Sequence, residues 1–518
     1  MKISRRQFLK MGLMGGAGLA LPFGTLSIPL SRLAASASVR SPSVEPFEVP
    51  LPIPPILKPL RTGAGTDYYE MIQKAGRQEI LPGLKTELWG YDGIFPGPTV
   101  EARSGRNVVI RQWNELPVPV ATHLHGGKTP PESDGYPTDL ILPKGDGHGT
   151  FAHAEHGPAG GHSHFFKDYR YPNEQRAATL WYHDHRMDFT GPQVYKGLAG
   201  LYILRDEVED SLPLPGGEKE VPLVIADRTF REDGSLYYPS VDPSLTEEPG
   251  VLSSATNAVY SGVFGDTVLV NGAPWPLMEV SNTRYRFRLL NASNARAYEL
   301  TLDPPPGGKP FVQLGGDGGL LEASVSHDRI LASPGERFDV VVDFSHYPVG
   351  TDVTLRNLRG EGRTSDVMRF KVARREKEES AVPERLAPVE ELPSPDDAEI
   401  TRRFQFISGV FGGMSTINGK VFDPDRIDAR PRLSSTEVWK LSGDPAHPIH
   451  LHLVQFRILS RDGGPPGPYD AGWKDTVFLE GGTVRVATRF DGYRGKYVLH
   501  CHNLEHEDMM MMANFEVV

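Results

Sequence analysis

Residues 500–511 read HCHNLEHEDMMM and hold the only cysteine of this 518-residue chain. Cys501 lies between His500 and His502, and His506 and Met511 follow it by five and ten residues. If residues 496–501 form a strand, successive side chains point to opposite faces, so Cys501 would face one site and its two neighbours another. Two histidines, one cysteine and a weak axial methionine form the ligand set of a blue-copper centre. The alternative is a buried free thiol beside core methionines, and this stretch alone leaves both interpretations open.

Three further windows carry closely spaced histidines: HLHG at 123–126, HDH at 183–185 and HPIHLH at 447–452. Histidines at positions i and i+2 of a strand share one face, which aims two imidazoles into one cleft. Ten of the 17 histidines fall in these windows and the first one. Such a grouping of histidines, with the single cysteine between two of them, would rarely arise by chance. The pattern therefore predicts a metal site built jointly by the first and last parts of the chain.

Length and composition limit the fold and the partners. A chain of 518 residues is too long for one core and suggests three domains. The 55 glycines and 46 prolines, with many short Val-, Ile-, Thr- and Tyr-rich runs, predict an all-β protein. A net charge of −11 argues against nucleic acid as a partner. A single cysteine excludes an intramolecular disulfide, which leaves the thiol available to a metal.

The N-terminus has the pattern of an export signal. Arg5 and Arg6 precede a Gly-rich, weakly apolar run and then the small residues at 35–37. The paired arginines resemble a twin-arginine signal, which exports folded proteins. A retained membrane anchor is the alternative, but Pro22 and Pro29 make a poor spanning helix. We therefore predict a signal peptide at 1–37, the twin-arginine export machinery as a partner, and a periplasmic or extracellular location.

Linker-like stretches divide the rest of the chain. Residues 206–220 are acidic and rich in Pro and Gly, and residues 374–400 are charged and Pro-rich. They predict domains at 38–205, 221–373 and 401–518, the middle one without metal. A Gly-rich insertion at 145–164 carries five histidines. It is interpreted as a solvated loop, with metal capture as the alternative.

The four histidine windows resemble those of the three-domain multicopper oxidases, in particular the bacterial laccase branch that includes spore-coat-type laccase and bilirubin oxidase. The phrases HGGKTPPESDGYPTD at 125–139, LWYHDHRM at 180–187 and GWKDT at 472–476 are similar to that branch as well. The resemblance covers essentially the whole mature chain. It implies three cupredoxin-like Greek-key β-barrel domains.

The resemblance also implies four copper ions and their ligands. The type 1 copper would be held by His447, Cys501, His506 and the axial Met511. The type 2 copper would be held by His123 and His450, and the two type 3 coppers by His125, His183, His185, His452, His500 and His502. Asp134 and Glu507 match acidic residues that such enzymes use for proton delivery. The alternatives are a turn aspartate for Asp134 and, for Glu507, membership of an acidic stretch with Glu505 and Asp508.

The function implied is a laccase-like oxidase. It would withdraw single electrons from phenols and aromatic amines at the type 1 copper and reduce O2 to water at the trinuclear cluster, acting as a monomer. One alternative is a cuprous oxidase with Cu(I) as reductant, although a Met-rich insertion near the type 1 site is absent from the sequence. The other is a non-catalytic cupredoxin-fold interaction protein, which the complete ligand set disfavours.

Overall fold

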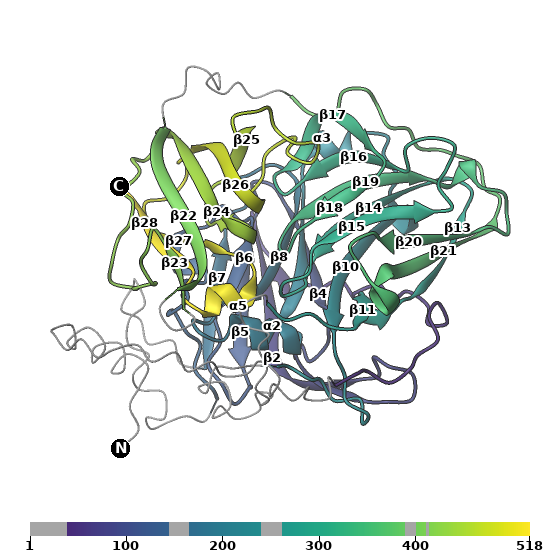
Figure 1. The fold of residues 1–518 in the computed structure, drawn as a ribbon, viewed down its shortest axis with the longest axis horizontal. Coiled ribbons are helices and arrows are strands. Elements are labelled where there is room, and N and C mark those ends of the chain that lie inside the picture. Colours follow the sequence, from purple (N-terminus) through teal and green to yellow (C-terminus); the bar gives the residue numbers. More distant parts are fainter. Residues whose placement is uncertain (1–38, 145–164, 240–261, 389–399, 411–413) are drawn as a thin grey trace, which may run out of the picture. The chain divides into compact units, whose positions relative to one another are not determined.

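The computed structural model describes residues 39–144, 165–239, 262–388, 400–410 and 414–518. Residues Val39–Val518 form one compact unit. The export signal predicted at 1–37 and the histidine-rich insertion at 145–164 lie outside the described residues. The described chain is built from strands in five sheets with a few short helices (Figure 1), which confirms the prediction of an all-β protein.

Two sheets come from the first part of the chain. One has the order β1-β2-β5-β7, with β3 paired to β2, and the other has the order β4-β9-β8-β6. Their bounds are β1 Arg61–Thr62, β2 Thr66–Gln78, β3 Thr86–Tyr91, β4 Gly97–Arg103, β5 Asn107–Asn114, β6 Thr122–His125, β7 Phe166–Tyr171, β8 Ala178–Asp184 and β9 Ala199–Arg205. The pairs β2·β5 and β4·β9 are parallel, so the chain crosses over between them rather than turning in a hairpin. Apolar side chains of both sheets, such as Val108, Ile110 and Leu180, share one core cluster.

Two more sheets form the middle part. Their orders are β12-β11-β10-β14-β19-β16-β17 and β13-β21-β20-β15-β18. The strands are β10 Glu220–Arg228, β11 Thr267–Val270, β12 Ala273–Pro274, β13 Leu277–Ser281, β14 Arg284–Asn291, β15 Tyr298–Asp303, β16 Phe311–Gly316, β17 Gly319–His327, β18 Ile330–Ala332, β19 Arg337–Asp343, β20 Asp352–Asn357 and β21 Asp366–Arg374. Alternate residues of facing strands, such as Phe287, Val340 and Phe370, fill one core between the two sheets.

The last part forms one seven-stranded sheet. It contains β22 Ile400–Val410, β23 Met414–Ile417, β24 Thr436–Leu451, β25 Phe456–Arg461, β26 Thr476–Arg489, β27 Gly495–Cys501 and β28 Met512–Val517. The long strand β24 pairs with β22, β26 and β27, so its second half can hold residues of the HPIHLH window against both β26 and β27. Trp439, Leu499 and Phe515 belong to the core of this sheet, and so does Cys501.

The helices are short and lie between strands. They are α2 Thr190–Lys196, α3 Glu207–Asp210 and α5 Leu504–Asp508, with 3-10 turns η2 Pro131–Ser133, η3 Gly217–Lys219, η5 Phe344–His346 and η6 Gly362–Ser365. Helix α2 packs against α5, and Asp508 of α5 accepts hydrogen bonds from the backbone N–H groups of Thr190 and Gly191, both 2.8 Å long. This contact joins the first part of the chain to the stretch around Cys501. None of the helices in the described part of the chain is long and apolar enough to cross a membrane.

Candidate metal centres

Strand pairing places the predicted histidines opposite one another. In the antiparallel pair β6·β8, His123 lies opposite His183. In the pair β24·β27, His450 lies opposite His500. Because histidines two residues apart on a strand share a face, each pairing brings a whole window into register with another. The local sequence and the strand register together therefore aim all four windows at one region.

Eight of the predicted histidines gather there, each at most 1% exposed. Their ring nitrogens form groups in which all candidate ligand atoms lie within 4.8 Å of one another. The groups are His125, His183 and His502; His185, His452 and His500; and His123, His450 and His452. The structure thus brings together every histidine that the sequence assigned to the trinuclear cluster. Their division between copper types stays a prediction.

Most of these rings are fixed through Nδ1. Four Nδ1 atoms lie on backbone carbonyls: His123 on Asp134 (2.6 Å), His183 on Asp184 (2.8 Å), His450 on Asp475 (2.9 Å) and His500 on Cys501 (3.0 Å). His452 Nδ1 lies 2.8 Å from Asp134 Oδ2. An N–H donated to each of these oxygens leaves the lone pair on Nε2, and Nε2 atoms meet across the cluster, 3.1 Å apart for His452 and His500.

The chemistry of this donor set fits a metal that takes imidazole ligands. Burial lowers the pKa of His123, His183 and His502 well below the usual histidine range, and that of His185 to about 3. These rings are therefore neutral. Within the described residues, His183 Nε2, His185 Nδ1, His125 Nδ1 and both nitrogens of His502 have no hydrogen-bond partner. Buried polar atoms are rarely left so, whereas neutral imidazole nitrogens are good ligands for copper.

A second group surrounds the cysteine. Cys501 Sγ lies 3.4 Å from His447 Nδ1 and 3.7 Å from His506 Nδ1, and these two nitrogens are 3.2 Å apart. The side chain of Asn503 caps α5 by accepting from the backbone N–H of His506, which fixes the position of that histidine. The thiol is fully buried, and burial raises its pKa. A thiolate here would therefore need a bound cation.

Three of the four consecutive methionines at 509–512 pack in two different hydrophobic clusters. Met511 belongs to the same hydrophobic core cluster as Cys501. Met510 and Met512 belong to a different cluster, with Tyr136. The backbone N–H of Cys501 also donates to the carbonyl of Met511 (3.1 Å). This placement supports Met511 as the axial ligand, a role that stays a prediction.

The two predicted acidic residues lie against the histidine cluster. Besides its contact with His452, Asp134 has its Oδ1 3.7 Å from His123 Nδ1. Glu507 accepts from the hydroxyl of Thr190 (2.7 Å), and its Oε2 lies 3.4 Å from His500 Nδ1. Both carboxyl groups are buried, and burial raises the pKa of each to about 8. Both can therefore hold a proton near neutral pH.

Sequence reasoning missed two carboxylates and one arginine. Asp475 has Oδ1 3.0 Å from His125 Nε2, and Asp444 has Oδ1 2.9 Å from His447 Nε2. Arg337 forms a buried ion pair with Asp475. Asp475 lies within the GWKDT phrase and could have been found there. Arg337 gave no signal, because it comes from the middle part, which has no histidine window.

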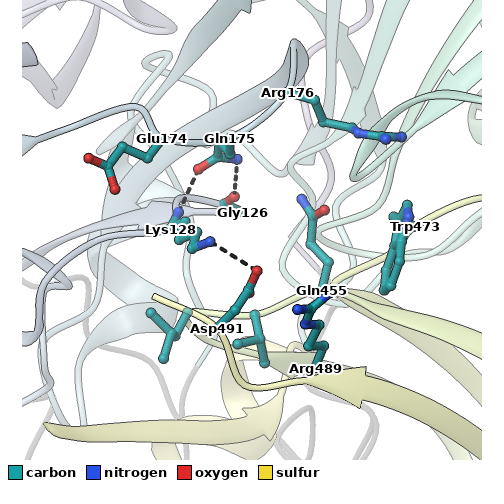
Figure 2. Close-up of a pocket in the computed structure, with 11 residues that line it drawn as sticks. Gly126, Lys128, Glu174, Gln175, Arg176, Gln455, Trp473, Arg489 and Asp491 are labelled. Carbon is teal, nitrogen blue, oxygen red and sulfur yellow. Dashed lines mark hydrogen bonds and ion pairs between the residues drawn. The ribbon is translucent and has the colours of Figure 1, made fainter. Parts of the chain in front are cut away.

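A surface pocket of about 260 Å³ adjoins two of the histidine windows, which together supply four of the eight clustered histidines (Figure 2). Gly126 follows His125 directly and Leu453 follows the HPIHLH window, and both line the pocket. Lys128 and Asp491 form a 3.2 Å ion pair across it. Solvent therefore comes within one residue of the buried histidines on this side.

Comparison with known proteins agrees with this geometry. Profiles of the multicopper oxidase family match residues 395–518, and residues 74–165 and 161–209. A profile of the twin-arginine translocation pathway signal sequence matches residues 2–22. The chain is 37% identical to a laccase of Bacillus subtilis, over 92% of this chain and 99% of that protein. It is 35% identical to a bilirubin oxidase of Albifimbria verrucaria, over 97% and 88%. The crystal structure of a laccase from Pediococcus acidilactici superposes with a TM-score of 0.77 at 31% identity, over 92% and 95%.

The chain belongs to the multicopper oxidase family. Within it, the similarities place the chain in the laccase branch, as a laccase-like oxidase that uses oxygen as acceptor. Its fold is cupredoxin-like, it binds copper ions, and its twin-arginine signal directs export to the periplasm or beyond. The predictions of family, fold class, function and localisation are confirmed.

The burial of Cys501 predicts how the copper-free protein reacts with thiol reagents. Because the side chain is 0% exposed, reaction requires opening of a core whose unfolding costs at least about 5 kcal/mol. We expect alkylation at least ~10³-fold slower in the folded protein than in denaturant, where one thiol per chain should react. Time-resolved thiol titration measures this, and rapid labelling of folded protein would contradict the buried position.

Proposed function

We propose that this laccase-like oxidase acts on phenols and aromatic amines and holds four copper ions, one of type 1, one of type 2 and two of type 3. Bound copper supplies the one-electron redox chemistry that links oxidation of the substrate to reduction of O2 to water. The proposed ligands are those named from the sequence: His447, Cys501, His506 and Met511 for type 1; His123 and His450 for type 2; His125, His183, His185, His452, His500 and His502 for type 3.

One observation carries this proposal: two buried donor sets meet at a single tripeptide. Cys501 belongs to the group with His447 and His506, while His500 and His502 each belong to one of the all-histidine groups. Strand β27 ends at Cys501, and the N–H of His502 donates to the carbonyl of Pro448 (2.6 Å), which holds the tripeptide against the HPIHLH window. The two sets are therefore joined covalently by one residue on either side.

The proposed site of substrate oxidation is the surface next to the group formed by His447, Cys501 and His506. His447 itself is buried, but Pro445 and Ala446 just before it are exposed. Asp444, whose side chain is 38% exposed, accepts from Ser408 as well as lying on His447 Nε2. Removal of an electron needs proximity rather than a deep pocket, so this shallow edge supports small aromatic reductants. The similarity to laccases and to a bilirubin oxidase supports the same substrate class.

Two acidic residues beside the histidine cluster would donate and take up protons. Asp134 orients His452 through Oδ2 and has its second oxygen beside His123. Glu507 is held by Thr190 next to His500. A carboxyl group with a pKa near 8 can release and recover a proton at little cost near neutral pH. We propose both as proton donors during water formation.

The domain boundaries and the monomeric state stay proposals. The sheets group into residues 61–205, 220–374 and 400–517, and this grouping supports domains at 38–205, 221–373 and 401–518. The described strand β21 runs to Arg374, so the second linker would begin at the end of that strand.

Oxygen uptake by the copper-loaded protein tests the function directly. A phenolic substrate should support rapid uptake, whereas Cu(I) offered under the same conditions should support slower uptake. An oxygen electrode measures both. Uptake with Cu(I) alone would favour the cuprous oxidase, and uptake with neither would favour the non-catalytic protein.

Replacing Cys501 by Ser tests the joining tripeptide. Serine has nearly the same size but offers no thiolate, so the intense visible colour of a thiolate–copper centre and the turnover of phenols should both disappear. Copper retained by the histidine groups should stay, as measured by metal analysis. Turnover at the wild-type rate would refute the proposed electron path.

Replacing Asp134 by Asn tests the proton role. The amide still accepts from His452 but carries no transferable proton, so we expect steady-state O2 consumption to fall by about 10²-fold or more. Anaerobic loss of the visible colour on adding a phenol should keep its rate. Glu505→Gln is a matched control, because Glu505 is also buried but is bonded to Tyr238 and Asn294. Equal effects of Asp134→Asn on both rates would remove the proposed role.

A further inference from the structure

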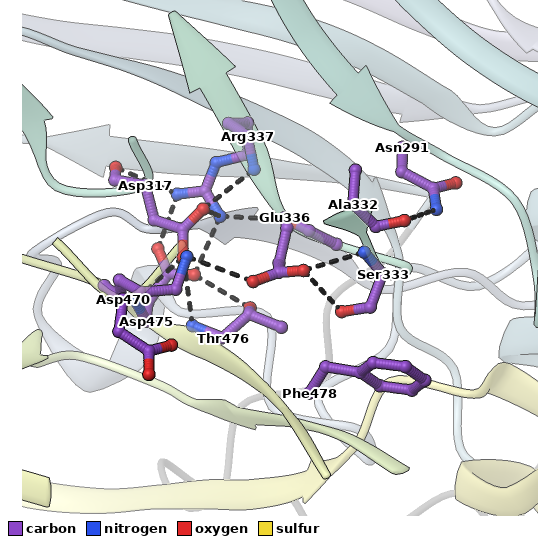
Figure 3. Close-up of polar contacts among 12 residues, drawn as sticks. Asn291, Asp317, Ala332, Ser333, Glu336, Arg337, Asp470, Asp475, Thr476 and Phe478 are labelled. Carbon is purple, nitrogen blue, oxygen red and sulfur yellow. Dashed lines mark hydrogen bonds and ion pairs between the residues drawn. The ribbon is translucent and has the colours of Figure 1, made fainter. Parts of the chain in front are cut away.

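Arg337 at the start of β19 is completely buried and uses all five N–H donors of its guanidinium (Figure 3). Nε donates to the carbonyl of Thr179 (2.9 Å), and Nη1 donates to the carbonyl of Gly335 (2.9 Å) and to Asp475 Oδ1 (2.7 Å). Nη2 donates to the carbonyl of Asp317 (3.1 Å) and to Asp475 Oδ2 (2.5 Å). The arginine therefore grips both oxygens of Asp475, in the two-pronged geometry that fixes a carboxylate most firmly.

Asp475 in turn contacts two of the candidate ligands. Its Oδ1 lies 3.0 Å from His125 Nε2, and its backbone carbonyl lies 2.9 Å from His450 Nδ1. The hydroxyl of Thr476 lies 3.1 Å from the same His125 nitrogen and donates to Asp475 Oδ1 (2.9 Å). A carboxylate paired with a guanidinium is ionised and only accepts hydrogen bonds. The proton of neutral His125 must therefore lie on Nε2.

This makes His125 differ from the rings fixed through Nδ1. His123, His183, His450, His452 and His500 have Nδ1 on an oxygen, which leaves Nε2 for a metal. In His125 the order is reversed: Nε2 is occupied, and Nδ1 has no partner within the described chain. Its Nδ1 is the atom available to the group with His183 and His502. The tautomer of this one ring thus depends on Asp475.

The turn before Arg337 also lies directly on the cluster. Gly335 has a backbone φ of +86°, and a Cβ there would come within 3.1 Å of His125 Cε1 and of ring atoms of His502. The last part of the chain holds this turn in return, because Lys474 Nζ lies 3.1 Å from both Glu336 and Asp317. Each part thus supplies a cation to an acid of the other part: Arg337 of the middle part pairs with Asp475 of the last part, and Lys474 of the last part pairs with two acids of the middle part. We call these contacts the crossed ion pairs.

We propose that Arg337 is a positioning residue for the trinuclear cluster, which sets the ring orientation and the tautomer of His125 through Asp475. The proposal rests on the proposed function, and it gives a specific task to the middle part of the chain, which supplies none of the proposed copper ligands. The guanidinium holds the carboxylate and the carboxylate holds Nε2–H, so Nδ1 would be the nitrogen that binds a metal ion. Outer partners of this kind typically change metal affinity by ~10–100-fold.

A purely structural role is the competing explanation, because breaking any buried ion pair destabilises a protein. The chain offers a matched control for it. Arg288 on β14 is equally buried, and its guanidinium also reaches Thr179, through the hydroxyl (3.0 Å). Its ion-pair partners are Glu209, Glu220 and Asp339, and within the described residues its guanidinium contacts none of the clustered histidines. Arg288→Lys therefore imposes a similar structural cost away from His125.

The experiment compares wild type, Arg337→Lys and Arg288→Lys after copper loading. Lysine keeps the charge but lacks the planar fork that holds both oxygens of Asp475. Copper per chain is measured across a series of chelator concentrations, together with the visible colour of the Cys501 centre and the thermal midpoint. We expect both variants to lower the midpoint. Only Arg337→Lys should release copper at ~10–100-fold lower chelator strength while keeping the visible colour.

Two results would overturn the proposal: wild-type copper retention in Arg337→Lys, or equal copper loss in Arg288→Lys. If Arg337→Lys does not fold, Asp475→Asn carries the test, since an amide can donate to Nε2 and so release the required tautomer; unchanged copper retention there would also refute the proposal. Failure of the proposed function gives a different result, because the wild type itself would then retain no copper beyond the Cys501 centre or consume no O2.

Discussion

The structure depends on one constraint: a buried nitrogen lone pair must find a partner. Eight imidazoles are buried together away from water, and a neutral imidazole has one donor and one acceptor. The fold satisfies one nitrogen of most of these rings with a fixed oxygen, usually a backbone carbonyl, which for His183 and His500 belongs to the next residue of the same strand. The opposite nitrogens are thereby concentrated in one dry volume. That arrangement is unfavourable for a metal-free protein and well suited to metal ions.

The β architecture makes this possible because strand register converts sequence spacing into direction. His123 opposite His183, and His450 opposite His500, are consequences of two antiparallel pairings. The C-terminal stretch is also held against the first part of the chain, because Asp508 accepts hydrogen bonds from backbone N–H groups at the start of α2. Because Glu507 and His506 lie in the same short helix α5, these hydrogen bonds also position Glu507 beside the histidine cluster and His506 beside Cys501. One interface therefore serves both donor sets.

Sequence reasoning predicts well what is local. The pairs at i and i+2, and the opposed directions of Cys501 and its neighbours, follow from strand geometry alone. Four consecutive methionines differ little in sequence spacing, and only the structure separates them: Met511 lies in the core of Cys501, whereas Met510 and Met512 lie in another cluster, which supports Met511 as the predicted axial ligand. Arg337 and Asp475 are 138 residues apart, and a buried arginine runs against the usual exposure of that residue. No periodic pattern in the sequence indicates such a contact, so the pairing of Arg337 with Asp475 is visible only in the three-dimensional structure.

The crossed ion pairs also explain why a part that supplies none of the proposed copper ligands would keep so many buried charges. Buried ion pairs contribute little net stability, since desolvation offsets most of their attraction. Hydrophobic residues would bind the middle part to the last part at least as tightly. They would not, however, fix the rotation of one part against the other, nor the direction of a carboxylate. Arg337 on Asp475 and Lys474 on Glu336 and Asp317 define a single arrangement, and it is the one that sets Gly335 against the rings of His125 and His502. We infer that specific orientation, rather than stability, is the reason for charge at this interface.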